Sequence, residues 1–188
     1  NILFPIIPTQ TKGDQILNKP LYEIGDKSLF IKELEFALIK NKAKIAVHSL
    51  KDMPYKIPEG FCLKAFLKRE NPFDALVSNK YSSIEGLPYN AKIGTSSIRR
   101  KCQLLAYRKD LKISSLRGNI ETRLDRLDQG AFDGIILAAS GLIRLKLMHR
   151  ITQVIPSEIC VPAIGQGIIV AECLKNDIST KKILERIT

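Results

Sequence analysis

The sequence predicts an α/β fold built as two lobes, with mixed, mostly parallel sheets and two hinge crossings. Short apolar segments of β type alternate with amphipathic helical segments, and such repeated β–α units favour parallel pairing. Two segments interrupt this alternation: residues 68–74, which are polar and contain Pro72, and residues 160–167, which contain Pro162 and two glycines. If both cross one cleft, the chain leaves a first lobe, builds a second and returns. The predicted domains are residues 1–68 plus 167–188 and residues 73–161, with hinges near 68–73 and 161–167.

The first lobe is expected to open with a strand in the apolar residues 1–8. A helix follows, because Ser28 suits a helix N-cap and apolar side chains recur at helical spacing after it. This apolar stripe consists of Phe30, Leu34, Ala37 and Leu38. Residues 44–49 and 61–68 then have the composition of strands.

The second lobe continues the alternation of strands and helices. Residues 74–78 form a short β-type segment, and residues 91–108 run from a strand into a helix. Ile98, Cys102 and Leu105 are expected on the inner face of that helix. The remaining expected elements are a strand at 111–117, a helix at 119–130 capped by Asn119, a buried strand at 132–139, a short helix, a strand at 167–173 and a helix near 178–187.

The chain has 188 residues and a formal net charge of +11, which predicts an anionic partner. Nucleic acid, an acidic surface and a polyanionic small molecule all fit, and charge alone does not choose among them. Base composition of the source genome explains the lysines equally well. The longest nearly uncharged apolar run, residues 134–143, is too short to span a bilayer, so no membrane association is expected. Residue 1 is Asn rather than Met and an apolar stretch begins at once, so the chain is expected to start inside a domain. No basic-then-apolar leader opens the sequence. A cytoplasmic location is expected, with an organelle as the alternative because a transit segment would lie upstream of Asn1.

The cysteines indicate neither a metal site nor a disulfide framework. Cys62, Cys102, Cys160 and Cys173 form no C-x-x-C pair, and only two histidines accompany them. No metal is therefore expected. Isolated cysteines fit a reducing compartment and the role of small buried hydrophobes.

Polar residues follow the predicted strands, where α/β sheets bind their ligands. Gly94 permits close backbone approach, and the hydroxyl residues Thr95, Ser96 and Ser97 open a helix whose first N–H groups form an anion cradle. Arg99 and Arg100 lie one turn further on. The alternative is an ordinary helix cap with two solvated arginines.

The next strand repeats this arrangement, with Arg117 at its end, Gly118 at the turn and Arg123 in the following helix. Residues 94–126 contain nine Lys or Arg but only three acidic residues. Arginine binds carboxylates through two parallel hydrogen bonds, so several arginines at strand ends favour a polycarboxylate ligand. A DNA-reading surface would more often be a basic helix face.

The segment "AVHSLKDMP", residues 46–54, places Asp52 at a strand end in a strongly basic protein. Such a carboxylate can balance a cationic intermediate or accept a hydrogen bond from a ring N–H, and it stays ionised unless burial intervenes. Lys51 beside it can bind an anionic group. The alternative is a local Lys–Asp pair that closes a turn before Pro54.

Taken together, these segments resemble the porphobilinogen deaminase (hydroxymethylbilane synthase) family. The resemblance lies in "AVHSLKDMP", "IGTSSIRRKCQL", "SLRGNIETRL", "FDGIILAASGLIRL" and "VPAIGQGIIVAEC", in that order and at compatible distances, with "KSLFIKELEFAL" matching an early helix. It implies an enzyme whose first two domains have the periplasmic-binding-protein type II architecture. Such an enzyme joins four porphobilinogen units head to tail, releasing ammonia from each, on a dipyrromethane cofactor held by a cysteine of a third domain.

The resemblance also implies a role for individual residues. Asp52 matches the catalytic aspartate, which holds pyrrole N–H groups and stabilises the cation formed as ammonia leaves. The residues that match cofactor ligands are Ser49, Lys51, Thr95, Ser96, Ser97, Arg99, Arg100, Arg117 and Gly118. Those that match substrate ligands are Arg123, Arg144 and Lys27, and Gly167 matches the return hinge.

The chain departs from the family at several points. Nothing before Asn1 supplies the family's early Arg and Ser, and neither the third domain nor its Gly-Gly-Cys attachment pattern is present. Glu23 and Ser28 stand where Lys and Gly are usual. We therefore expect a first domain that is incomplete, and 188 residues that alone neither hold the cofactor covalently nor turn over.

Two other functions remain open at this stage: a non-catalytic two-lobed module that binds anions, and a nucleic-acid binder. The enzyme interpretation predicts a monomer that binds porphobilinogen and neither nucleic acid nor membrane.

Overall fold

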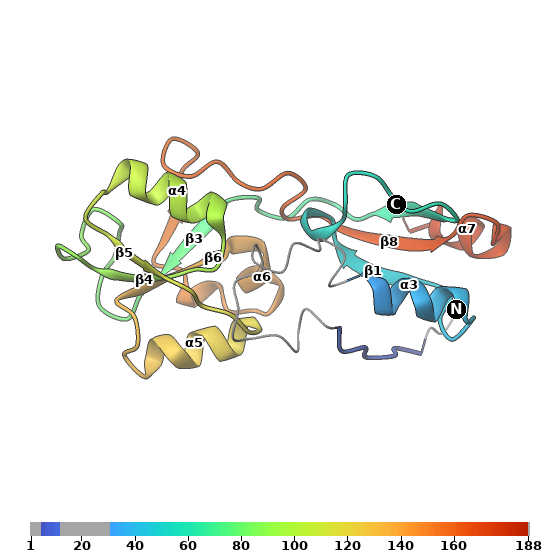
Figure 1. The fold of residues 1–188 in the computed structure, drawn as a ribbon, viewed down its shortest axis with the longest axis horizontal. Coiled ribbons are helices and arrows are strands. Elements are labelled where there is room, and N and C mark those ends of the chain that lie inside the picture. Colours follow the sequence, from blue (N-terminus) through green and yellow to red (C-terminus); the bar gives the residue numbers. More distant parts are fainter. Residues whose placement is uncertain (1–4, 12–30, 188) are drawn as a thin grey trace. The chain divides into compact units, whose positions relative to one another are not determined.

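The computed structural model describes residues 5–11 and 31–187, which form two compact units (Figure 1). Unit 1 consists of Asn1–Lys68 and Ile169–Thr188, and unit 2 consists of Arg69–Ile168. The chain enters unit 2 after Lys68 and leaves it after Ile168. That the two crossing segments act as hinges stays a prediction.

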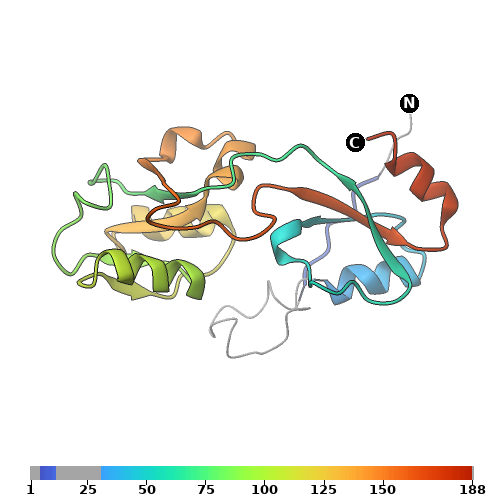
Figure 2. The same cartoon turned by 90° about the horizontal axis from the view of Figure 1, so that it is seen from above.

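Unit 1 contains an antiparallel sheet of three strands in the order β1-β8-β2 (Figures 1 and 2). The central strand β8 comes from the end of the chain, so it joins the two parts of the sequence that flank unit 2. The described elements are α3 (Lys32–Ile39), β1 (Ala46–Ser49), η1 (Leu50–Asp52), β2 (Phe61–Phe66), β8 (Ile169–Leu174) and α7 (Ile178–Leu184).

Alternation along β8 sorts its side chains between the two faces of the sheet. Ala171 and Cys173 pack with Ala65 of β2 and Leu184 of α7 in one small core. Glu172 points the other way and meets His48 of β1. The sheet therefore has an apolar face beneath α7 and a second face that buries a polar pair.

Unit 2 contains a sheet of five strands in the order β5-β4-β6-β3-β7. Strand β4 pairs in parallel with β5 and β6, whereas β3 pairs antiparallel with β6 and β7. The strands are β3 (Asp74–Val77), β4 (Lys92–Gly94), β5 (Lys112–Ser114), β6 (Gly134–Ala138) and β7 (Gln153–Ile155). The helices are α4 (Ile98–Tyr107), α5 (Ile120–Asp128), α6 (Ala139–Arg144) and η2 (Met148–Arg150).

Two apolar cores cover the two faces of this sheet, as strand alternation requires. On one face Leu76 and Ile136 pack with Leu104 of α4. On the other face Val77 and Ile135, which adjoin Leu76 and Ile136 on the same strands, pack in the core that includes α5 and α6. Helices α4 and α5 accordingly lie on opposite faces of the sheet (Figure 1).

Most predicted elements are present, and mixed sheets are confirmed, but parallel pairing does not dominate. Among the described residues four of the six strand pairings are antiparallel. In unit 1 both β1 and β2 pair with the distant β8 rather than through a β–α–β crossover. The described residues 5–8 of the expected opening strand form no strand, and β7 was not predicted.

Two details of the predicted helices were wrong, and one was confirmed. Ile31, and not Ser28, holds the N-cap position of α3; Ser28 and Phe30 lie outside the described residues. In α4, Ile98 and Cys102 are exposed, because the buried stripe runs through Arg100 and Leu104. The predicted cap of α5 is confirmed, since Asn119 accepts a hydrogen bond from the Thr122 N–H at 2.8 Å.

Across the part of the chain that the structure describes, we find no helix with the length and apolarity needed to cross a membrane.

Candidate functional site

The carboxyl ends of the parallel strands β4 and β5 bring two polar loops together in unit 2. Thr95 directly follows β4, and its N–H donates to the Ser114 carbonyl at 2.9 Å. The hydroxyls of Ser96 and Ser115 lie 2.9 Å apart, and Ser96 also donates to the Leu116 carbonyl at 2.8 Å. The two predicted ligand-binding loops are therefore joined. We call residues 95–97 and 115–119 the strand-end cradle.

Helix α4 begins in this cradle. The Ser97 hydroxyl accepts from the Arg100 N–H at 3.4 Å and caps the helix, and the Thr95 hydroxyl accepts from the Ser97 N–H at 3.2 Å. Thr95 is buried, whereas Ser96 and Ser97 are partly exposed. The helix N-terminus thus adds backbone N–H groups and the positive end of its dipole to the cradle, as an anion site requires.

The second loop of the cradle depends on Gly118. Its φ of +108° is a conformation that favours glycine, and a Cβ there would lie 2.9 Å from Thr122 Cγ2. The Arg123 Nε donates to the Gly118 carbonyl at 2.7 Å, so the arginine lies against this turn. Arg117, three residues after β5 ends, is partly exposed. The predicted Arg117 and Gly118 therefore lie in one turn, and Arg123 of α5 donates to it.

Arg99 and Arg100 meet a residue that the sequence interpretation missed, Asp74. The Arg100 Nε and Nη2 donate to Asp74 Oδ1 at 2.9 and 2.7 Å, and Arg99 Nη2 donates to Asp74 Oδ2 at 2.7 Å. Asp74 is fully buried, and Arg100 is 6% exposed and also donates to the Ile136 carbonyl at 2.9 Å. Arg99 and Arg100, which were predicted to bind the cofactor, therefore both bind a buried carboxylate in this structure.

Burial alone would raise the pKa of Asp74. The charge and hydrogen bonds of Arg100, the charge of Arg99 and a hydrogen bond from Gln166 outweigh burial and hold that pKa below its ordinary value. The only signal in the sequence was an acid directly before an apolar strand in a basic protein. Nothing local shows that its partners lie on α4.

Asp74 also connects the two crossing segments. The Gln166 side chain, fully buried, donates to Asp74 Oδ1 at 2.9 Å and to the Pro72 carbonyl at 2.7 Å. The Cys160 thiol donates to Asp74 Oδ2 at 3.4 Å, and burial followed by the Asp74 charge raises the pKa of that thiol to about 11. We call Asp74, Arg99, Arg100, Cys160 and Gln166 the Asp74 cluster.

Arg144 contacts Gly167 in the crossing segment 160–167, which we call the return segment; residues 68–74 are the entry segment. Arg144 Nη2 donates to the Gly167 carbonyl at 2.7 Å, and the Glu70 N–H donates to the same carbonyl at 2.9 Å. Gly167 has a φ of +91°, and a Cβ there would collide with the Glu70 carbonyl. The return segment is thus fixed against the entry segment, and the predicted Arg144 lies beside it rather than in the strand-end cradle.

The remaining predicted residues belong to unit 1. Ser49 ends β1 and is exposed, and the 3-10 turn η1 that follows carries Lys51 and the exposed Asp52. Before this turn, His48 Nε2 lies 3.0 Å from Glu172 Oε2, and this pair is buried. That Asp52 faces the arginines of unit 2 stays a prediction, and Lys27 lies outside the described residues.

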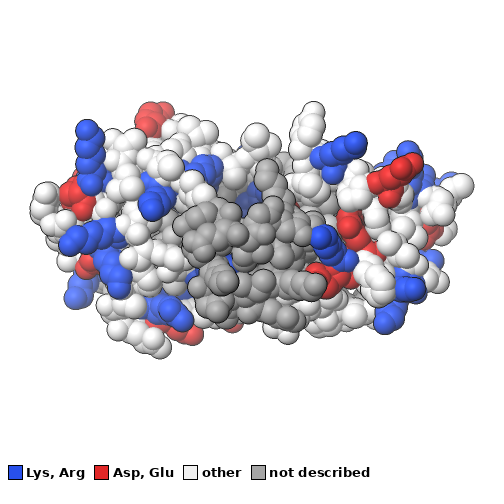
Figure 3. All heavy atoms as spheres, in the orientation of Figure 1, with Lys and Arg blue, Asp and Glu red and all other residues white. Residues whose placement is uncertain are grey.

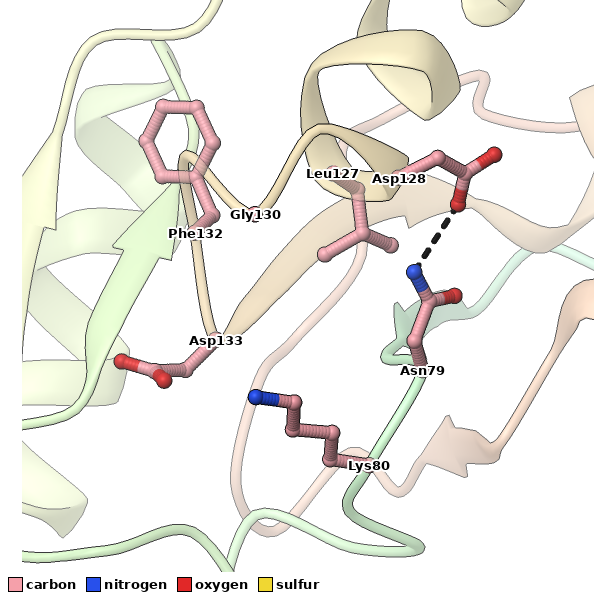
Figure 4. Close-up of a pocket in the computed structure, with 7 residues that line it drawn as sticks. All are labelled: Asn79, Lys80, Leu127, Asp128, Gly130, Phe132 and Asp133. Carbon is pink, nitrogen blue, oxygen red and sulfur yellow. Dashed lines mark hydrogen bonds between the residues drawn. The ribbon is translucent and has the colours of Figure 1, made fainter.

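A small hollow of about 120 Å³ lies at the opposite, amino-terminal edge of the unit 2 sheet (Figure 4). It is bounded by Asn79, Lys80, Leu127, Asp128, Gly130, Phe132 and Asp133. Asn79 donates to Asp128 at 2.9 Å across it. None of the predicted site residues lines this hollow, so it is separate from the strand-end cradle.

Solved structures show the class of protein to which this fold belongs. A candidate methionine-binding lipoprotein from Bacillus subtilis matches 83% of this chain and 74% of its own, with a TM-score of 0.53 and 14% identity. An extracellular binding protein assigned to an amino-acid ABC transporter of the same species matches 89% and 78%, with a TM-score of 0.51 and 12% identity. At these identities the likeness shows the fold alone, which is the two-lobed α/β type of the type II periplasmic binding proteins.

Sequence relatives define the family. A family model described as "Porphobilinogen deaminase, dipyromethane cofactor binding domain" matches residues 1–182, and the chain belongs to this family. It is 60% identical over 187 residues to the porphobilinogen deaminase of Francisella tularensis subsp. tularensis and 59% identical to that of subsp. novicida. All of this chain is covered, and it spans 61% of the length of these relatives.

Proposed function

We propose that the protein to which this chain belongs is a transferase of tetrapyrrole (haem) biosynthesis. It joins four porphobilinogen molecules head to tail, releases an ammonia from each and yields hydroxymethylbilane. The observation that carries this proposal is 60% identity to a porphobilinogen deaminase along the full length of the chain. The cationic strand ends of unit 2 suit the acetate and propionate groups of the pyrroles.

The residues of the strand-end cradle fit a dipyrromethane, whose pyrrole rings carry several carboxylates. Hydroxyls, helix N-terminal amides and arginine forks are the donors that carboxylates accept from. We propose that Thr95, Ser96, Ser97, Arg117 and Gly118 hold the cofactor, together with Ser49 and Lys51. When bound, a dipyrromethane supplies the terminal pyrrole carbon from which chain growth starts.

Asp52 is proposed as the catalytic residue. A carboxylate at the exposed end of a strand can accept hydrogen bonds from pyrrole N–H groups and can stabilise the positive charge that develops as ammonia departs. Arg123, Arg144 and Lys27 are proposed to bind the substrate carboxylates.

Arg99 and Arg100 have a dual role in this proposal. A guanidinium group has five N–H donors. Arg100 uses some of them on Asp74 and the Ile136 carbonyl, and Arg99 uses some on Asp74, Cys160 and the Val161 carbonyl. We propose that the donors left over on each arginine face cofactor carboxylates, while Asp74 fixes the direction of both side chains.

The two rival functions predict different behaviour. A non-catalytic anion-binding module would keep its function without Asp52. A nucleic-acid binder would need a continuous basic surface, whereas on the face drawn in Figure 3 the Lys and Arg side chains of each unit are interspersed with acidic and neutral ones. We propose a cytoplasmic monomer that binds neither nucleic acid nor membranes.

Mass spectrometry of the complete gene product tests the proposal. We expect a covalent adduct with the mass of two linked pyrroles, and release of ammonia when porphobilinogen is added. A full-length protein that carries no adduct and releases no ammonia would contradict the proposal. Salt-sensitive binding to duplex DNA would favour the nucleic-acid function instead.

A further inference from the structure

Two thiols that the proposed function does not use lie together in unit 1. Cys62 on β2 and Cys173 on β8 are directly opposite one another in the antiparallel ladder, and their sulfur atoms are 3.7 Å apart. Both cysteines are free. The positions are 111 residues apart in sequence, so their spacing gave no sign of this pairing.

Backbone geometry at this position suits a disulfide bond. Opposite residues of an antiparallel ladder have Cα atoms roughly 4.5–5.5 Å apart. That separation falls within the range of about 4.4–6.8 Å found across disulfides. Small rotations of the two side chains can therefore bring the sulfurs to bonding distance without moving the strands.

The two thiols differ in access to small reagents. Cys173 is fully buried beneath α7, in the core with Ala65 and Leu184, whereas Cys62 is partly exposed. Burial, and then the hydrogen bond and charge of Cys62, raise the pKa of the Cys173 thiol to about 12. An external reagent therefore reaches Cys62 first, and Cys173 is placed to react second.

We propose that Cys62 and Cys173 form a disulfide when the protein meets a small-molecule disulfide such as oxidised glutathione. The Cys62 thiolate attacks one sulfur of the reagent, which breaks its S–S bond, forms a mixed disulfide and releases one glutathione thiolate. The Cys173 sulfur then loses its proton to water and attacks Cys62 Sγ, which releases the second glutathione. Overall, two protein thiols are oxidised and one oxidised glutathione is reduced to two glutathione molecules.

The crosslink would close a loop that contains all of unit 2. Strand β2 leads into unit 2 after Lys68, and β8 begins where the chain returns at Ile169. A disulfide between these strands therefore fixes the two chain segments that flank unit 2. Because closing a long loop restricts the unfolded chain, we expect a higher melting temperature for the oxidised protein.

Peptide mapping of the full-length protein tests this inference directly. Cleavage after Glu59, Glu70, Glu158, Glu172 and Glu185 places Cys62 in residues 60–70, Cys160 in 159–172 and Cys173 in 173–185. After incubation with oxidised glutathione we expect peptide 60–70 linked to peptide 173–185, at about two mass units below the sum of the two reduced peptides, and a melting temperature several degrees higher. Exposed Cys102 should carry glutathione and report that the reagent is active.

Matched variants separate this pair from the other thiols. C62S should lose the linked peptide, whereas C102S should keep it. Glutathione that stays on Cys62, a link from Cys62 to Cys160, or unmodified Cys62 under conditions that fully modify Cys102 would each overturn the proposal. So would an oxidised protein that melts at or below the temperature of the reduced one. Because the readout is mass and stability, its failure would leave the proposed transferase function intact.

Discussion

Asp74 is a buried acid around which several side chains of unit 2 are arranged. Its carboxylate is fully buried and accepts hydrogen bonds from Arg99, Arg100 and Gln166. A buried charge without a partner is costly, so each member of such a cluster depends on the others. The Asp74 cluster therefore joins the start of α4 to the crossing segments through hydrogen bonds of its side chains.

Replacing Asp74 by Asn should leave the buried Arg100 without its charged partner. We expect D74N to lower the free energy of unfolding by about 3 kcal/mol at neutral pH, measured by urea denaturation. D125N, which changes an exposed acid on α5, is the control and should have an effect within about 0.5 kcal/mol. Equal effects of the two substitutions would contradict a structural role for Asp74.

The difference between D74N and the unmodified protein should also depend on pH. The folded-state pKa of Asp74 lies below the ordinary 3.8, so its charge adds stability that is complete above about pH 4. This stability is lost as the pH falls through the folded pKa, and D74N lacks it throughout. The unfolding free energies of D74N and the unmodified protein should therefore converge as the pH is lowered from 7 to 3. A difference that stays constant over this range would argue against the ion pair.

His48 and Glu172 form a second buried pair, next to the turn that carries Asp52. Within the described part of the chain Glu172 Oε1 is buried with no hydrogen-bond partner, so the carboxylate depends on His48. We expect H48Q and E172Q each to lower the unfolding free energy by about 2 kcal/mol, and the double variant to lower it by less than their sum. Additive losses in urea denaturation would show that the two side chains do not interact.

At the scale of elements, local signals predicted most of what the structure contains. Asn119 caps α5 as expected, since the Asn side chain and the helix it begins are adjacent in sequence. The orientation of α4 was not predictable, because Arg100 is buried by a carboxylate 26 positions earlier. Strand β7, which was not predicted, forms by pairing with β3, far earlier in the chain. The errors at α4 and β7 thus concern contacts made across the fold.

The turn at Gly118 can be tested against a glycine of similar conformation. Gly118 and Gly130 both have positive φ, at +108° and +75°. A Cβ added at Gly118 would collide with Thr122, whereas a Cβ added at Gly130 would meet no atom within 4 Å. We expect G130A to lower the unfolding free energy by about 1 kcal/mol through backbone strain alone, and G118A to cost more because of the added clash. If G118A costs no more than G130A, the turn tolerates a side chain.

At the scale of the whole molecule, the order of motifs predicted the family and the two-lobed fold, and the comparisons confirm both. The balance of parallel and antiparallel strands was not predictable from alternating elements, because β8 returns from the end of the chain to pair with β1 and β2. The proposed site combines Asp52 of unit 1 with the strand-end cradle of unit 2. That combination is the central claim of the account.

The most direct test is the release of ammonia from porphobilinogen by the full-length protein with Asp52 replaced by Asn. We expect D52N to fold, to melt within a few degrees of the unmodified protein and still to carry the dipyrromethane adduct. Its rate of ammonia release should fall by about 10²-fold or more, because a charged group that stabilises the transition state is lost. D125N should release ammonia at the unmodified rate. A D52N protein that carries the adduct and releases ammonia within about twofold of the unmodified rate would contradict the central claim.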